Sequence, residues 1–213
     1  MTAVTVEVWS DVMCPFCYLG DAVLQEALAE FPQRDAVTVE YRSFQLSPEL
    51  TDTPKSMEEH LAGRYPEEQM ATMHEQLRER GDQHGITFNF DQSLMVNTHK
   101  AHQFHHFAAA EGKGNDAVRQ LFKAHFTDGV NVANLDELVA IADELGLDPA
   151  AAREALEAET HFEAVDADIS LARKMGISGV PFFVFNNKYA VSGAQPKEMF
   201  LQALTAAAAV EQS

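Results

Sequence analysis

Two cysteines stand close together near the amino terminus, in the segment Cys14-Pro15-Phe16-Cys17, and the chain contains no other cysteine. Residues 3–9 before them alternate valine with other residues, which predicts a β-strand. From Pro15 onward apolar residues recur at three- and four-residue steps, which predicts a helix. Proline suits the first helical turn because its missing N–H would have no partner there. The two thiols are therefore expected at a junction between a strand and a helix.

The first turn of a helix favours negative charge, because its N–H groups are unpaired and the helix dipole is positive there. The thiolate of Cys14 is such a charge, so we expect Cys14 to be the reactive nucleophile. Cys17 lies one turn further along, within reach of a disulfide with Cys14, and the pair predicts a redox dithiol. The alternatives are half of a zinc site or two inert buried thiols. Structural zinc usually has four ligands, and the chain has no second cysteine pair.

Composition limits the classes of partner. The chain has 213 residues, enough to bury a full core, and a formal charge of -18 at pH 7, which repels nucleic acid and anionic lipid. No apolar run approaches the roughly 18 residues of a spanning helix. The amino terminus lacks the basic and then apolar pattern of a signal peptide. With cysteines only in the dithiol, these features predict a cytoplasmic protein that binds neither nucleic acid nor membrane.

Two α/β stretches flank a helical one. A strand is predicted at 37–44, and the segments 182–185 and 189–192 predict a hairpin around an asparagine-rich turn. A last helix is expected from Pro196 to about Ala208. Between the two stretches, apolar stripes and end signals predict about six helices over residues 55–175. The pattern predicts an α/β protein, with one sheet and a helical insertion.

Some helix starts can be placed from the sequence. Ser56 and Thr160 each precede a glutamate by three positions, which predicts a capping box at both places. Asp148 followed by proline predicts another start.

A histidine cluster lies in the middle of the chain. At 100° per residue three of its members fall within a narrow arc opposite Ala101 and Phe104, so we expect a polar surface. Lining of a substrate cleft and metal ligation are the alternatives, and no metal site is predicted. The cluster consists of His99, His102, His105 and His106.

The chain resembles the DsbA-like branch of the thioredoxin superfamily, and within it the cytosolic FrnE-like dithiol oxidoreductases, over essentially its whole length. The matching stretches are Trp9–Gly20, Phe44–Pro48, Asn97–His102, Gly176–Phe183 and Ser192–Gln195. The resemblance implies a thioredoxin fold with a large all-helical insertion domain. It places the first part of that fold, with the CxxC, at 1–50, the insertion at 51–174, and the second part, with a cis-proline loop, at 175–213.

The resemblance also implies roles for particular residues. Cys14 would attack a disulfide and Cys17 would resolve the product, while Pro181 would be cis. The backbone of Val180 would pair with the substrate chain like an added strand. The further substrate contacts that it implies are Pro15, Phe16 and His102.

The function that follows is a thiol-disulfide oxidoreductase acting on a protein or small-molecule disulfide. No cofactor is expected, and glutathione is the candidate co-substrate. Phe16 stands where DsbA carries histidine, and without that cation we expect the reducing or isomerising direction. Two alternatives stay open. One is a kappa-like glutathione transferase or 2-hydroxychromene-2-carboxylate isomerase type of enzyme, whose members usually have serine in place of Cys14. The other is a non-enzymatic redox-sensing module.

Overall fold

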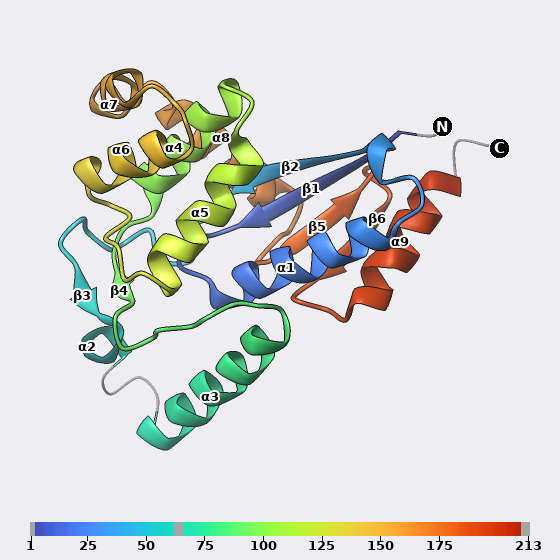
Figure 1. The fold of residues 1–213 in the computed structure, drawn as a ribbon, viewed down its shortest axis with the longest axis horizontal. Coiled ribbons are helices and arrows are strands. Elements are labelled where there is room, and N and C mark those ends of the chain that lie inside the picture. The colour runs from blue at the N-terminus through green and yellow to red at the C-terminus, as the bar shows by residue number, and fades with distance from the viewer. Residues whose placement is uncertain (1–2, 62–65, 210–213) are drawn as a thin grey trace.

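A four-stranded sheet forms the centre of the computed structural model, which describes residues 3–61 and 66–209 (Figure 1). The strand order is β2-β1-β5-β6, with β1 and β2 parallel and the other neighbours antiparallel. The strands are β1 (Val4–Ser10), β2 (Val37–Ser43), β5 (Phe182–Phe185) and β6 (Tyr189–Ser192). Asn186 and Asn187 both have positive φ, which confirms the predicted hairpin turn between β5 and β6.

Helices cover both faces of this sheet. Alternate residues of a strand point to opposite faces, and Val4, Val6 and Val8 all enter a core built with α1 and α9. Trp9 points the other way and packs with Ala172 of α8. The covering helices are α1 (Pro15–Glu30), α8 (Phe162–Lys174) and α9 (Lys197–Ala209).

The insertion between β2 and β5 has a hydrophobic core of its own. Phe104, Leu121 and Leu138, from three different helices, are fully buried in it. A short strand pair, β3 with β4, also lies in this region. The elements are β3 (Lys55–Ser56), α2 (Met57–Leu61), α3 (Glu67–Gln83), β4 (Leu94–Met95), α4 (His99–Ala110), α5 (Gly114–Phe126), α6 (Leu135–Glu144) and α7 (Pro149–Glu157), and a 3-10 turn, η1 (Arg34–Ala36), precedes β2.

The predicted fold class, a thioredoxin-type sheet with a helical insertion, is confirmed by this arrangement. The described part of the insertion region, counting α8, holds seven helices where about six were expected. None of the helices in residues 3–61 and 66–209 combines the length and hydropathy needed to span a bilayer.

One of the two predicted capping boxes forms. Ser56 accepts from the N–H of Glu59 at 3.0 Å, and Glu59 accepts in return from the N–H of Ser56 at 3.1 Å. The box predicted at Thr160 is wrong, because α8 begins only at Phe162. The N–H of Thr160 instead donates to a carbonyl of α7, after a residue of positive φ, so that segment still closes the preceding helix.

The surface position expected for the histidine cluster is also wrong. His102 and His105 are each only 5% exposed. The reason is tertiary, because α4 packs against α5, α7 and α8 and therefore has little free surface. The helical stripe of α4 marks one buried face, whereas the neighbouring helices bury most of the others.

The division between core and surface predicts unequal effects for two leucines on helices. Leu204 in α9 is 0% exposed, and Leu171 in α8 is 39% exposed. Leu204→Ala is expected to lower the free energy of unfolding by about 2–5 kcal/mol. Leu171→Ala, the matched control, is expected to lower it by less than about 1 kcal/mol. Urea unfolding followed by circular dichroism measures both, and equal losses would contradict the packing described for α9.

Candidate active site

The candidate site lies at the end of the sheet where strands β1 and β2 finish, and several chain segments converge there. The parallel strands β1 and β2 both end there, so the residues after Ser10 and Ser43 emerge side by side. The N–H of Phe44 donates to the carbonyl of Ser10 at 3.0 Å and extends the pairing. Strand β5 runs in the opposite direction and begins at the same edge, where Phe182 pairs with Trp9. Segments distant in sequence therefore meet around the start of α1.

The two thiols stand at the predicted junction of strand and helix. Cys14 is the N-cap residue of α1, and Pro15 is the first helical residue. The N–H of Cys17 donates to the carbonyl of Cys14 at 3.0 Å, so the second cysteine lies one turn along the helix. Both cysteines are free, with exposed fractions of 4% for Cys14 and 2% for Cys17. Both thiols are therefore largely covered by the rest of the chain.

A cis-proline loop faces the first thiol. The Val180–Pro181 bond is cis, as the resemblance implied. The thiol of Cys14 donates to the carbonyl of Val180 with a sulfur–oxygen distance of 3.6 Å. Gly20 allows this close approach of α1, because a Cβ there would lie 3.1 Å from both the Pro181 ring and the Phe183 ring. Gly20 ends the first matching stretch, but nothing in the sequence alone indicated this role.

The environment of Cys17 opposes its ionisation. Burial raises the pKa of the Cys17 thiol well above its ordinary value, and the neighbouring Cys14 raises it further. The backbone N–H of Asp11 and the hydroxyl of Ser10 lower this pKa, but they are the smaller influence. Cys17 is therefore a protonated thiol at neutral pH, held next to two groups that stabilise its thiolate.

A buried carboxylate links the segments behind the dithiol. Asp11 is 0% exposed and accepts from the N–H of Leu46 at 2.7 Å and from the N–H of Met13 at 3.5 Å. The ring Nε2 of His102 lies 3.4 Å from the same carboxylate. His102 thus contacts Asp11 and is 5% exposed. The substrate contact that the resemblance implied for His102 stays a prediction.

Asn97 attaches the loop after β2 to the insertion. Its side-chain oxygen accepts from Gln45 at 3.0 Å and from the N–H of His99 at 2.8 Å. Its side-chain nitrogen donates to the carbonyl of Leu50 at 2.8 Å. The matching stretches around residues 44–48 and 97–102 therefore contact each other, although neither contains a cysteine.

Apolar side chains in the segments around the dithiol are at least partly exposed. Phe16 is 38% exposed, while Pro15 and Val180 are half-buried. Leu46, held by Asp11, is 45% exposed, and sequence reasoning assigned it no role. An exposed leucine in a loop gives no signal until the fold brings it to the site.

Two further histidines are buried in neutral form. Burial lowers the pKa of His105 to about 3 and that of His125 to about 4. Neither ring nitrogen of His125 has a hydrogen-bond partner. In the described ranges, no group of three or more His, Cys, Asp or Glu side chains is arranged to hold a metal ion.

The comparisons with known proteins agree with this geometry. The model of the DSBA-like thioredoxin domain matches residues 5–205. The chain belongs to this family. The YwbO protein of Bacillus subtilis, whose function is uncharacterized, is 28% identical over 95% of this chain and 96% of its own.

Solved structures extend the likeness. The probable DsbA oxidoreductase SCO1869 of Streptomyces coelicolor is 34% identical, with a TM-score of 0.90 over 96% of this chain and 89% of its own. A 2-hydroxychromene-2-carboxylate isomerase has 18% identity and a TM-score of 0.71, over 95% of each chain. The cytosolic disulfide reductase DsbM of Pseudomonas aeruginosa, solved with glutathione, has 17% identity and a TM-score of 0.62, over 98% and 97%. The last two share the fold.

The buried neutral histidines predict a loss of stability in acid. An unfolded histidine binds a proton below about pH 6.5, whereas His125 in the folded protein does so only near its lowered pKa of about 4. Protons therefore favour the unfolded chain as the pH falls from about 6.5 towards 4. Between pH 7 and pH 5 this histidine is expected to remove about 2 kcal/mol of stability.

Urea unfolding of the wild type and of His125→Leu at pH 8, 7 and 5 measures this effect. The variant is expected to lose about 2 kcal/mol less than the wild type between pH 7 and 5. Between pH 8 and 7, His125 should not alter how the free energy of unfolding changes with pH. If the free energies of unfolding of the two proteins differed by the same amount at all three pH values, His125 would not be the source of the loss of stability in acid.

Proposed function

We propose that this protein is a thiol-disulfide oxidoreductase that works through the Cys14–Cys17 dithiol. One observation carries the proposal: Cys14 begins α1 with its sulfur 3.6 Å from the carbonyl of Val180, and Cys17 lies one turn behind it. The first sulfur thus faces the backbone of a loop that can align a peptide, and the second is placed to displace whatever the first has bound. Membership of the DSBA-like family supports this kind of chemistry.

The reaction would proceed in two exchanges. The Cys14 thiolate attacks one sulfur of a substrate disulfide, which forms a mixed disulfide and releases the other substrate sulfur as a thiolate. Cys17 then loses its proton and attacks the sulfur of Cys14, which closes the Cys14–Cys17 disulfide and releases the second substrate thiolate. The substrate gains two electrons, the dithiol loses two, and an external thiol returns the enzyme to its reduced form.

The raised pKa of Cys17 supports the division of roles. A sulfur that stays protonated does not compete with Cys14 for the first attack. When the mixed disulfide has formed, the negative charge of Cys14 is gone and no longer disfavours ionisation of its neighbour. The Ser10 hydroxyl and the Asp11 N–H then stabilise the Cys17 thiolate that performs the second step.

The finer assignment is a FrnE-like cytosolic reductase or isomerase, with glutathione as the thiol that recycles it. Phe16 supports the reducing direction, because it places no positive charge in the first turn of α1. The glutathione-bound cytosolic disulfide reductase of the same fold is consistent with this assignment. The partly exposed apolar side chains of Phe16, Leu46 and Val180, in the segments around the dithiol, suit a protein or small-molecule disulfide with apolar neighbours.

Two alternatives make different predictions. An isomerase or transferase of the kappa-like type would not need a resolving thiol, and the shared fold of the 2-hydroxychromene-2-carboxylate isomerase is the observation in its favour. In that case glutathione affinity and turnover would survive in Cys14→Ser. A redox sensor would form the Cys14–Cys17 disulfide but would show no catalytic turnover with insulin or a glutathionylated peptide.

If Cys17 is the resolving thiol, its removal should leave substrates trapped on Cys14. Cys17→Ala is expected to accumulate a mixed disulfide on Cys14 when incubated with oxidised glutathione or a cell extract, because the second exchange is lost. Mass spectrometry of the intact protein measures the adduct. The matched Cys14→Ala variant should accumulate far less, since the buried Cys17 thiol is protonated. Equal adducts on both variants would contradict the assigned roles.

The proposed reducing direction predicts that Phe16→His raises the reduction potential of the dithiol. An imidazolium in the first turn stabilises the reduced, thiolate form of the dithiol, and a gain of about 1.4 kcal/mol raises the reduction potential by about 30 mV. Equilibration with glutathione measures the potential. The increase is expected to be larger at pH 6, where the imidazole is charged, than at pH 8. Phe16→Leu is the control and should leave the potential unchanged at both values.

A further inference from the structure

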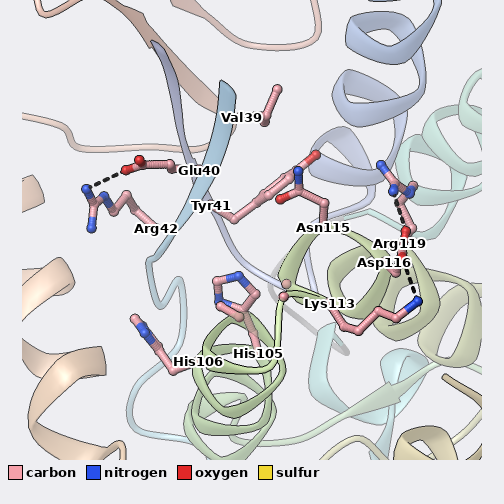
Figure 2. A pocket seen from close by; sticks show the side chains of 13 residues that line it. Val39, Glu40, Tyr41, Arg42, His105, His106, Lys113, Asn115, Asp116 and Arg119 are labelled. Carbon is pink, nitrogen blue, oxygen red and sulfur yellow. Dashed lines mark hydrogen bonds and ion pairs between the residues drawn. The ribbon is translucent and has the colours of Figure 1, made fainter. Parts of the chain in front are cut away.

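A pocket apart from the dithiol lies between the outer edge of β2 and the turn that joins α4 to α5 (Figure 2). Its volume is about 570 Å³, within the size range of ligand sites in proteins. Neither cysteine lines it, nor does the cis-proline loop. The dithiol chemistry therefore gives this pocket no role.

The free edge of the sheet forms one wall of the pocket. Four consecutive residues, Val39 to Arg42, line it. The N–H of Phe44 points inward to β1, whereas the N–H of Ser43 points outward and donates to a side chain of α8 at 3.0 Å. Since N–H directions alternate along a strand, the N–H and C=O groups of Val39 and Tyr41 point outward as well. These four groups form no hydrogen bond within the described ranges.

The opposite wall carries more hydrogen-bond donors. Helix α5 begins there, and its N-cap residue, Lys113, gives it no side-chain cap, so the first N–H groups are unpaired. His105 also lines the pocket and is 5% exposed, yet its ring forms no hydrogen bond in the described part. Its Nε2 lies 3.5 Å from the point that a Cβ on Gly114 would occupy, so the ring faces the start of α5. A buried, unpartnered imidazole beside free N–H groups indicates a ligand rich in acceptors.

The charges that line the pocket limit the ligand to one of low negative charge. Arg42 contacts Glu7 at 2.9 Å, Glu40 at 3.0 Å and Asp168 at 3.5 Å, so its charge is already balanced. Lys113, Arg119 and Asp116 remain, an excess of one positive charge in a chain of formal charge -18. Asp116 contacts both Arg119, at 2.7 Å, and Lys113, at 3.7 Å, as Figure 2 shows. A single carboxylate matches this excess, whereas a polyphosphate would exceed it.

We propose that this pocket binds an extended peptide segment of about four residues that ends in a free carboxylate. The peptide backbone pairs with the outward groups of Val39 and Tyr41, in the manner of strand addition to an open sheet edge. Its carboxylate accepts from the unpaired N–H groups at the start of α5 and lies beside Lys113. The alternating donors and acceptors of a strand edge match another peptide backbone, which an inorganic anion does not provide. Binding does not depend on the dithiol.

Amide NMR and hydrogen exchange test the register directly. The probe is acetyl-Val-Thr-Val-Thr with a free carboxylate, and the same peptide with an amidated end is the comparison. The free acid is expected to shift and protect the amides of Val39 and Tyr41, while those of Glu40 and Arg42, already bonded to β1, do not change. The amidated peptide should bind about tenfold more weakly, since it lacks a charge-assisted hydrogen bond.

Variants separate the two ends of the site. Val39→Pro removes one outward donor and is tolerated at a free edge, so it should weaken binding several-fold while thermal unfolding stays cooperative. Lys113→Gln should also weaken binding of the free acid, and Lys174→Gln, on α8 outside the pocket, should not. A protein with both Cys14→Ser and Cys17→Ser should bind as the wild type does, which separates this inference from the proposed activity.

Some results would overturn the proposal. They are no amide shift at millimolar peptide, equal affinity for the acid and the amide, and shifts centred on Val180 instead of Tyr41. Displacement of the peptide by inorganic phosphate, without protection of the strand amides, would mean an anion site only and would likewise overturn it.

Discussion

The candidate site depends on one buried carboxylate. Asp11 follows β1 directly, is 0% exposed, and accepts hydrogen bonds from Met13 and Leu46 while His102 lies 3.4 Å away. A buried carboxylate without partners would cost several kcal/mol. These groups from the β1–α1 turn, the loop after β2, and α4 are therefore held to it together. Fixing that turn also fixes Cys14 at the start of α1, so the position of this thiol depends on contacts made by the insertion.

The same burial makes the two thiols unequal. Cys14 stands at a helix start and faces the Val180 carbonyl, whereas Cys17 lies deeper and its pKa is raised by burial. A difference of this kind gives a dithiol an order of events, with one sulfur attacking and the other resolving. The helical insertion contributes His102 to this site and also the second wall of the pocket beside β2. The packing of the insertion against the sheet thus shapes both the surroundings of the dithiol and the separate pocket.

Much of the fold was predictable from local signals. The alternation in β1, the proline after Cys14 and the asparagine turn before Tyr189 each act over a few residues, and the structure confirms them. The start of α8 was not predictable in this way, because the closing turn of α7 uses the Thr160 N–H that would donate to the Glu163 side chain in a capping box. The burial of His102 and His105 was missed for a related reason. Helical periodicity identifies the most apolar face of α4, but not how many neighbours surround it.

The sequence by itself determined the chemical groups of the candidate site and the family: two thiols at a helix start, a proline before an apolar strand, and a family pattern that covers most of the chain. Tertiary structure decided which groups surround that chemistry. Asp11, Leu46 and His102 are separated by dozens of residues and meet only because β1 and β2 end at one edge and α4 packs beside it. The open edge of β2 beside α5 is likewise a result of packing. Local sequence sets the conformation of a segment, whereas burial and unpaired backbone groups arise only when segments come together.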